Sequence, residues 1–521
     1  MTNGEPPAPS SEQSYLSHRQ ILVVLGGLMA GMFLAALDQS IVGTALPRIV
    51  SDLGGLEHLS WVVTAYLLTS TASTPLWGKI SDLYGRRPMF QAAIVVFLLG
   101  SLVAGAAGSM GVLIGGRAVQ GLGAGGLIAL ALATIGDIIP PRERGRYQGY
   151  FAAVFGTSSV AGPLLGGWFT DGPGWQWIFW INIPIGVAAL VVTSIALKMP
   201  VVRRDHSIDY LGAASVVASV TSLLLYTTWA GTQYGWADPV SLTLLGFGIV
   251  LAAVFVLVES RATEPILPLR LFRNRTYTPV IIFTAIMGLA MFGGIIYVPV
   301  YLQVVQGFSP TESGLALLPM VVGIFATSVP SGQIMSRTGR YKIFPIVGAG
   351  MTGVGLLLMS TLDATTPYWV LATYFFVFGA GLGFTMQIVV TAVQNAVERR
   401  DMGAATSSVT FFRSMGAAFG TAIFGAVLTS RLGHYLAEAS GGDLPAGVDA
   451  NEIANNVEAI HALPDDIKAV VIDAWVRALH DVFLTAVPII AIGFVTAFFI
   501  PELRLKQAGE PADAAALLAA E

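Results

Sequence analysis

Long apolar runs, separated by short segments that carry most of the charge, set the strongest limit on how this chain can fold. A helix needs about 20 apolar residues to cross the hydrocarbon core of a bilayer. Only 11% of the residues are charged, whereas a soluble domain carries about 25%. The sequence therefore predicts an all-α membrane protein with 14 transmembrane helices. The predicted runs lie at roughly 21–46, 59–78, 89–108, 111–135, 147–170, 176–197, 209–229, 240–259, 277–303, 313–333, 343–362, 367–391, 404–430 and 481–500.

The basic residues provide an independent test of this count. With the N-terminus inside, 21 of the 27 Lys and Arg residues fall in inner loops and tails, and four fall in outer loops. Such an asymmetry follows the positive-inside rule. We predict a multi-pass protein of the cell (plasma) membrane with both termini cytoplasmic. Residues 1–20 are expected to form a disordered cytoplasmic tail, and residues 506–521 a second cytoplasmic tail.

An internal repeat indicates how the helices are grouped. GKISDLYGRRP (78–88) follows the second run and GQIMSRTGRYK (332–342) follows the tenth, and both end in a basic cluster. Parallel repeats are one of the known plans of transporters. We therefore expect two pseudo-symmetric six-helix bundles, 21–200 and 263–505, and an inserted helix pair at 201–262.

One long external loop is expected at 431–480. Within LPDDIKAVVIDAWVRALHDVF (463–483) the apolar residues follow a helical period. This pattern predicts an amphipathic helix at the outer mouth or on the membrane surface, leading into the last span. A lid, a lipid contact and a simple connector remain open as its role.

Three charged residues lie deep in the predicted spans: Asp38, Arg117 and Arg413. Counted from the outer ends of their spans, Asp38 and Arg117 differ in depth by roughly 3 Å. An Asp–Arg pair lowers the cost of placing either charge in the membrane. It also makes protonation of the carboxylate sensitive to its surroundings. A proton relay and a purely structural ion pair are both compatible with this spacing.

No motif for catalysis or for a cofactor is found. The chain has no Cys, which excludes disulfides and thiol chemistry. GLGAGG (121–126) formally matches a dinucleotide-binding pattern, but it lies in a predicted span and follows no strand. Neither a P-loop nor an H-E-x-x-H pattern occurs. We expect no enzyme, no metal, no cofactor and no nucleic-acid partner, and a monomer in the lipid bilayer.

Five motifs in order resemble the major facilitator superfamily, and in particular its fourteen-helix drug:proton antiporter branch. LDQSIVGTALP (37–47) resembles the first-helix motif of that branch, and GKISDLYGRRP resembles the superfamily loop motif. GRAVQGLGAGG (116–126), GTSSVAGPLLGGW (156–168) and WQWIFWINIPIG (175–186) resemble its fourth-, fifth- and sixth-helix motifs. The resemblance covers roughly residues 20–505.

The resemblance implies roles for several residues. It implies proton coupling by Asp38 and Arg117, with the proton gradient as the energy source. It also implies a cytoplasmic latch that joins the two halves, with Asp82 facing a helix N-terminus, for which GAATSS (403–408) is the candidate. Ser336 replaces this Asp in the second repeat, so a symmetrical second latch is not expected. The latch set is Gly78, Asp82, Gly85, Arg86 and Arg87, and the set for a gating fifth helix is Gly156, Gly162, Pro163, Gly166 and Gly167.

A substrate cavity is expected between the halves, lined by polar and aromatic side chains near the midplane. Arg413 is expected to meet an anionic or zwitterionic substrate, an unrecognised acid or a structural partner. The candidates are Trp61, Thr64, Tyr66, Gln120, Asn182, Tyr297, Gln303, Gln387, Gln394 and Arg413.

The function expected from these features is proton-coupled export of small amphipathic compounds by alternating access, as in a multidrug exporter. Two alternatives remain: a proton-coupled exporter of an endogenous metabolite, lipid or siderophore, and a membrane sensor or assembly partner that transports nothing.

Overall fold

The computed structural model describes residues 18–53, 59–144, 147–197, 209–230, 234–439, 460 and 463–505. Residues 1–17 of the expected N-terminal tail (1–20) and the expected tail at 506–521 lie outside the described residues, whereas residues 18–20 begin the first helix. In the first half the helices are α1 (His18–Leu53), α2 (Leu59–Tyr84), α3 (Arg86–Gly105), α4 (Met110–Ile138), α5 (Pro141–Arg144), α6 (Gln148–Asp171), α7 (Trp177–Trp180) and α8 (Asn182–Ala196), and the inserted pair is α9 (Tyr210–Trp229) and α10 (Pro239–Glu259). In the second half they are η3 (Leu269–Arg273), α11 (Tyr277–Val300), η4 (Tyr301–Val305), α12 (Pro310–Ala316), α13 (Leu318–Thr338), α14 (Ile343–Met359), α15 (Tyr368–Thr385), α16 (Ile388–Ala396), η5 (Arg399–Asp401), α17 (Met402–Ala439) and α20 (Asp465–Phe498).

Eleven helical stretches of the described residues are long and apolar enough to cross a membrane. Helices α2, α6 and α14 accompany them, with 26, 24 and 17 residues. Helix α10 exposes large apolar side chains such as Phe247, Ile249 and Val250, as a helix against lipid does. The protein is thus a polytopic helical membrane protein. The count of 14 crossing helices remains a prediction.

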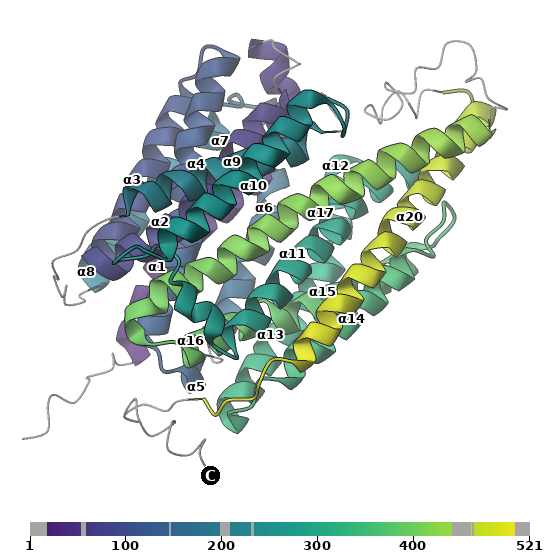
Figure 1. Ribbon diagram of the computed structural model, residues 1–521. Helices are drawn as coiled ribbons and strands as arrows, with labels where there is room; N and C mark the ends of the chain where they lie inside the picture. Colours follow the sequence, from purple (N-terminus) through teal and green to yellow (C-terminus); the bar gives the residue numbers. More distant parts are fainter. Residues whose placement is uncertain are drawn as a thin grey trace, which may run out of the picture.

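Equivalent helices of the two halves pack in the same way. In the first half α4 packs on α2 and α3, and α1 packs on α6 and α8. In the second half α15 packs on α13 and α14, and α11 packs on α17 and α20. The two sets lie side by side in Figure 1, purple to blue and teal to yellow. The halves meet where α2 crosses α17 and where α6 crosses α13, which is a symmetrical pair of contacts.

The repeat found in the sequence is also visible in the backbone. Gly85 connects α2 to α3 with a φ of 95°, and Gly339 connects α13 to α14 with a φ of 72°. Residues with a side chain rarely adopt such angles. Both copies of the motif therefore place a glycine where the chain reverses between two helices.

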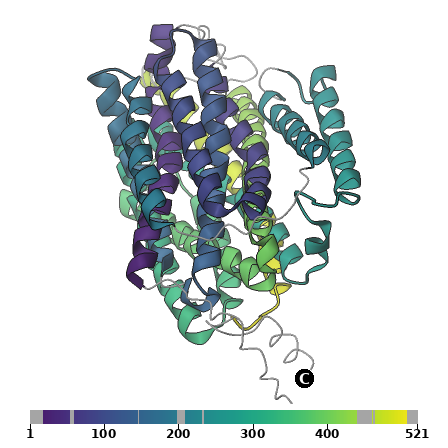
Figure 2. The same cartoon turned by 90° about the vertical axis from the view of Figure 1, so that its left-hand side faces the viewer.

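Helices α9 and α10 form a pair at the edge of the molecule, as Figure 2 shows. Helix α9 packs on α2 and on α17, one from each half. The contact is apolar and includes Ala72, Val220 and Phe411. Lys79 of α2 adds an ion pair of 2.6 Å with Glu264, which follows α10. The inserted pair therefore touches both bundles without interrupting either.

The expected external loop at 431–480 is partly helical, which corrects the predicted boundaries. Helix α17 runs on to Ala439, and α20 begins at Asp465 and continues into the last apolar run. Trp475 is buried in the core of the second half. Arg431 and Asp481 pair at 3.2 Å between the two helices. The amphipathic stripe thus extends α20 against α17. Residues 440–459 lie outside the described residues.

Candidate functional site

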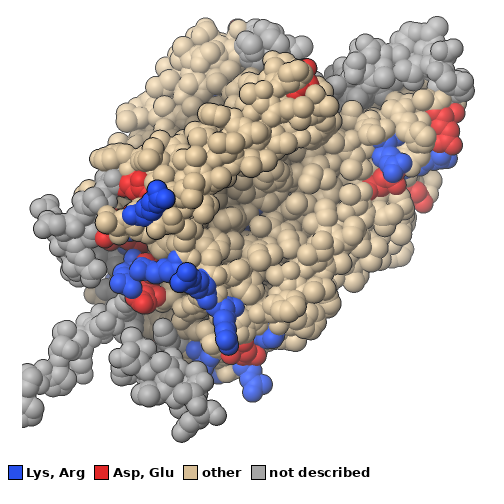
Figure 3. Space-filling model, in the orientation of Figure 1, with Lys and Arg blue, Asp and Glu red and all other residues tan. Residues whose placement is uncertain are grey.

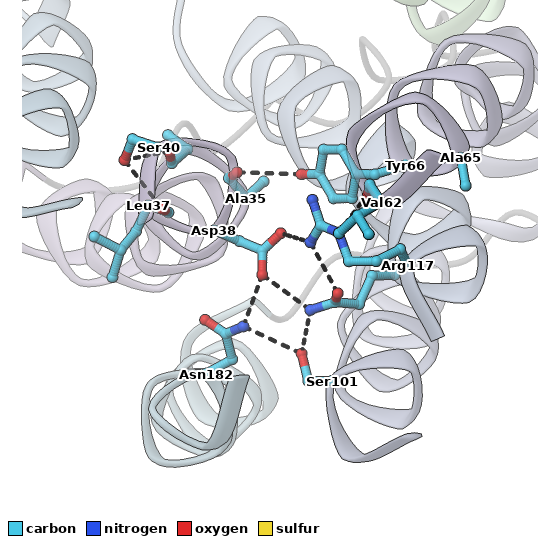
Figure 4. A network of polar contacts seen from close by, with 12 residues as sticks. Ala35, Leu37, Asp38, Ser40, Val62, Ala65, Tyr66, Ser101, Arg117 and Asn182 are labelled. Carbon is cyan, nitrogen blue, oxygen red and sulfur yellow. Dashed lines mark hydrogen bonds and ion pairs between the residues drawn. The ribbon is translucent and has the colours of Figure 1, made fainter. Parts of the chain in front are cut away.

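Asp38 of α1 is fully buried, and Figure 4 shows Ser101, Arg117 and Asn182 around its carboxylate. Its Oδ2 forms an ion pair with Nη1 of Arg117 from α4. Its Oδ1 accepts hydrogen bonds from Nε2 of Gln120 at 2.9 Å and from Nδ2 of Asn182 at 3.0 Å. Both amides also donate to Oγ of Ser101, at 2.7 and 3.2 Å. The ion pair predicted from helix depth is present, inside a polar network that the prediction did not include.

Gln120 and Asn182 therefore belong to the Asp38 network, which corrects their expected place in the cavity. Gln120 lies three residues after Arg117 on α4, so both side chains face α1. Asn182 starts α8 and donates to the same carboxylate oxygen as Gln120. Together with Arg117, these amides give the Asp38 carboxylate an ion pair and two hydrogen bonds, which offset the cost of its desolvation.

Tyr66 of α2 separates this network from the space between the halves. The guanidinium of Arg117 lies 4.2 Å from the centroid of the Tyr66 ring. The Tyr66 hydroxyl donates to the carbonyl of Ala35 on α1 at 3.2 Å. Tyr66 and Ala35 line the central cavity, whereas Asp38 and Arg117 are 0% and 1% exposed. The buried ion pair thus lies behind a wall of the cavity.

A cavity of about 730 Å³ lies between the halves. Five predicted residues line it: Thr64, Tyr66, Tyr297, Gln387 and Arg413. Most of the remaining lining is apolar, with Gln39, Trp236 and several Ser and Thr residues interspersed. Its volume falls within the range of about 300–1,000 Å³ that is common for small-molecule sites.

Three other predicted cavity residues lie outside the cavity lining. Trp61 packs its ring edge-on against Trp229, 5.5 Å between centroids. Gln303 lies in the π-helical segment η4 at the end of α11. Gln394 is buried between the halves near the basic end and donates to the carbonyl of Leu132 at 3.0 Å. Polarity inside a span marks buried contacts between helices as well as cavity linings.

Asp82 joins the two halves at the end of the molecule where α2 meets α17. Its Oδ1 and Oδ2 accept from the backbone N–H groups of Gly403 and Ala404, both at 2.9 Å. These groups open α17, where the helix dipole favours an anion. Gly78 permits the close approach, because a Cβ there would lie 2.7 Å from the carbonyl oxygen of Gly403. The predicted contact between this motif and GAATSS is therefore present.

Arg86 connects Asp82 to a carboxylate that the sequence reasoning missed. It pairs with Asp82 at 2.6 Å and with Asp137, near the end of α4, at 2.7 Å. Asp137 lies just beyond an apolar run and next to a basic loop. This position is the one feature of the sequence that could have indicated an ion pair there. Asp137 thus belongs to the latch through its ion pair with Arg86.

Two arginines close the same end of the molecule on the symmetrical crossing. Arg144 Nη1 donates to Oε1 of Gln394 at 2.8 Å, from α5 to α16. Arg142 donates to the carbonyls of Ser336 and Arg337 at 3.0 and 3.1 Å, at the end of α13. The second crossing is therefore held by arginines on backbone carbonyls and on a side-chain amide, instead of a carboxylate on a helix N-terminus.

Figure 3 shows most of the visible Lys and Arg at this end of the molecule and a smaller group at the opposite end, whereas the middle of the visible face is drawn without charged side chains. The cavity extends the other way: its lining includes Thr429 of α17 and Trp236, which precedes α10. The conformation is therefore sealed at the basic end.

A model of the Major Facilitator Superfamily matches residues 28–421, more than half of the chain. The chain belongs to this superfamily. An uncharacterized MFS-type transporter of Mycobacterium tuberculosis is 41% identical over 491 residues, 94% of this chain and 71% of that protein. The multidrug transporter protein MdtP of Bacillus subtilis is 35% identical, with 95% of each chain covered. The human organic anion transporter MFSD10 shares the superfamily fold, with a TM-score of 0.57 at 15% identity, over 92% of this chain and 99% of that one.

In this superfamily member the fifth predicted span, α6, lies against both halves. Gly162 faces α1, where the Ser40 hydroxyl donates to the carbonyl of Ser158 at 2.9 Å. Gly156 faces α13 of the other half, where Val321 and Phe325 lie. Helix α6 continues through Pro163 and Gly166, and nothing lies within 4 Å of a Cβ built on Gly167. The predicted gating glycines thus have different neighbours.

This difference gives a matched test of α6. A Cβ at Gly162 would lie 2.7 Å from Cβ of Ser40, closer than real Cβ atoms approach. We expect Gly162→Ala to lower transport at least about threefold and to lower the melting temperature, because overpacking costs about 1–3 kcal/mol. Gly167→Ala, with open space, is the control and is expected to match wild type. Equal transport and melting temperatures for both variants would contradict the α1–α6 contact.

Proposed function

We propose that the protein is a proton-coupled exporter of small amphipathic compounds in the fourteen-helix drug:proton antiporter branch. It is a membrane-embedded transporter of a family whose members are not enzymes, and its relatives include the multidrug transporter protein MdtP and Multidrug resistance protein 3 of Bacillus subtilis. A fungal relative, 31% identical, is the efflux pump FUS6 of Gibberella moniliformis. These names support export, and the count of 14 helices is part of the proposal.

The observation that carries proton coupling is the buried Asp38 network. A carboxylate in a membrane interior is costly, and such residues mark ion or proton pathways. Protonation would weaken the attraction to Arg117 and turn one acceptor oxygen into a donor. Since Arg117, Gln120 and Asn182 sit on α4 and α8, the charge of Asp38 would affect how these helices pack on α1. Coupling a proton to a rearrangement requires such a link.

The latch supports alternating access. We place the basic end in the cytoplasm, following the positive-inside rule, so that the sealed conformation faces outward. Asn395 donates to the carbonyl of Arg504 at 3.1 Å, which holds the end of the described chain at the latch side. In this orientation we place both termini in the cytoplasm and the protein in the plasma membrane. Inward opening would require Asp82 to leave the N-terminus of α17.

The test is counter-transport in proteoliposomes with an acidic lumen. The permanently charged dye ethidium and the anionic dye fluorescein are offered outside, and pyranine inside reports protons. We expect uptake of at least one dye together with proton efflux, absent from protein-free vesicles and abolished by nigericin. If neither dye is taken up and adding either dye causes no proton efflux from the lumen, the exporter proposal fails.

A further inference from the structure

Arg413, in the first third of α17, has an unusual environment for a charged side chain in a membrane protein. It lines the central cavity and also a small side pocket formed with Thr284, Gly288 and Val389. Within the described part of the chain, its guanidinium has no hydrogen-bond or ion-pair partner, unlike Arg86, Arg117 and Arg144. The residue therefore borders both spaces, and the donors of its guanidinium are unused by the described residues.

The cavity offers no compensating carboxylate. Among the described residues that line it, none is Asp or Glu, and Arg413 is the one charged residue. Asp38 does not supply the missing charge, because it lies behind Tyr66 and is already paired with Arg117. The electrostatic character of the cavity is thus set by one positive charge.

An unpaired cation at membrane depth costs several kcal/mol, and a ligand of opposite charge removes that cost. A guanidinium offers five donors in a planar fork that fits carboxylate, sulfonate or phosphate oxygens two at a time. We propose that this cavity binds amphipathic organic anions, with Arg413 holding the acidic group. The apolar body of the ligand packs against Phe155, Met291, Ile295 and Met320, which line the same cavity.

The same arrangement disfavours organic cations. A cationic ligand loses its hydration in the cavity, meets Arg413, and finds no carboxylate among the described lining residues. The assignment deepens the proposed export function, on which transport of the anion rests. Binding of the anion does not depend on it.

The test is equilibrium binding of two dyes that share a xanthene framework and differ in charge. Fluorescein is anionic and tetramethylrhodamine methyl ester is cationic, and both are titrated by anisotropy with the full-length protein in detergent. We expect wild type to bind fluorescein more tightly than the rhodamine. Arg413→Gln is expected to raise the Kd for fluorescein at least about tenfold, as loss of one charge-assisted pair implies, and Arg413→Lys to raise it less.

Arg431→Gln is the matched control, because Arg431 lies on the same helix outside the cavity and pairs with Asp481. It is expected to bind fluorescein like wild type. The anion assignment is overturned if wild type prefers the rhodamine, if neither dye binds, or if Arg413→Gln binds fluorescein unchanged. Proton-coupled uptake of ethidium in proteoliposomes would, in those cases, leave the exporter proposal standing.

Discussion

Replacing Asp38 with Asn is expected to lower proton-driven transport at least about tenfold, within the range of typical coupling energies. Asn cannot exchange a proton at this position, and its amide no longer balances the charge of Arg117. Counter-transport in proteoliposomes measures the loss. Dye binding is expected to persist, because Tyr66 separates Asp38 from the cavity.

A second variant separates coupling from folding. Asp38→Asn leaves a buried cation unpaired, which costs about 3–5 kcal/mol. The double variant with Arg117→Gln removes both charges and is expected to regain thermal stability without regaining transport. Asp52→Asn, an exposed carboxylate near the end of the same helix, is the control. Proton-driven transport by the double variant at the wild-type rate would make the pair structural.

Replacing Asp82 with Asn is expected to open the basic end of the molecule. The change removes the carboxylate that accepts hydrogen bonds from the backbone N–H groups of Gly403 and Ala404 and that pairs with Arg86. Since the chain has no Cys, single cysteines can report the opening. Thr406→Cys, buried near the latch, is expected to react with N-ethylmaleimide at least about tenfold faster in the Asp82→Asn background, as a coupling of about 1.4 kcal/mol implies.

A second cysteine, in the part of the cavity lining that lies away from the basic end, completes this experiment. Thr429→Cys, exposed in the cavity lining, is expected to react more slowly in the Asp82→Asn background, because opening one end closes the other. Glu143→Gln, an exposed carboxylate on α5, is the control. Unchanged labelling at both positions would show that Asp82 does not hold this conformation.

The helices could be predicted from apolar runs, and two of the site contacts could be predicted from helix depth and from a motif. Apolar runs fixed the helical stretches, and depth along a helix placed Asp38 beside Arg117. The latch was predicted from the resemblance of residues 78–88 to the superfamily loop motif, which implies a helix N-terminus opposite Asp82. The roles of these residues remain predictions.

Contacts that depend on which face of a helix meets which neighbour could not be predicted. Gln120, Asn182 and Gln394 are polar residues in apolar runs, and nothing in the sequence distinguishes a cavity wall from a helix–helix contact. The contact of Asp137 was not predicted either, because its partner Arg86 is 51 positions away in the sequence. The helix that begins α20 was predicted from its apolar stripe, whereas the extension of α17 to Ala439 was not, because it depends on packing against α20.

The positions of Arg413 and Asp38 in different bundles have an electrical consequence. If an anion leaves on Arg413 while a proton enters through Asp38, the exchange of one for one carries two elementary charges across the membrane. A potential of 100 mV then contributes about 4.6 kcal/mol, at about 2.3 kcal/mol per charge. An interior-negative voltage would drive export even at equal pH, whereas exchanging a monovalent cation for a proton would move no net charge.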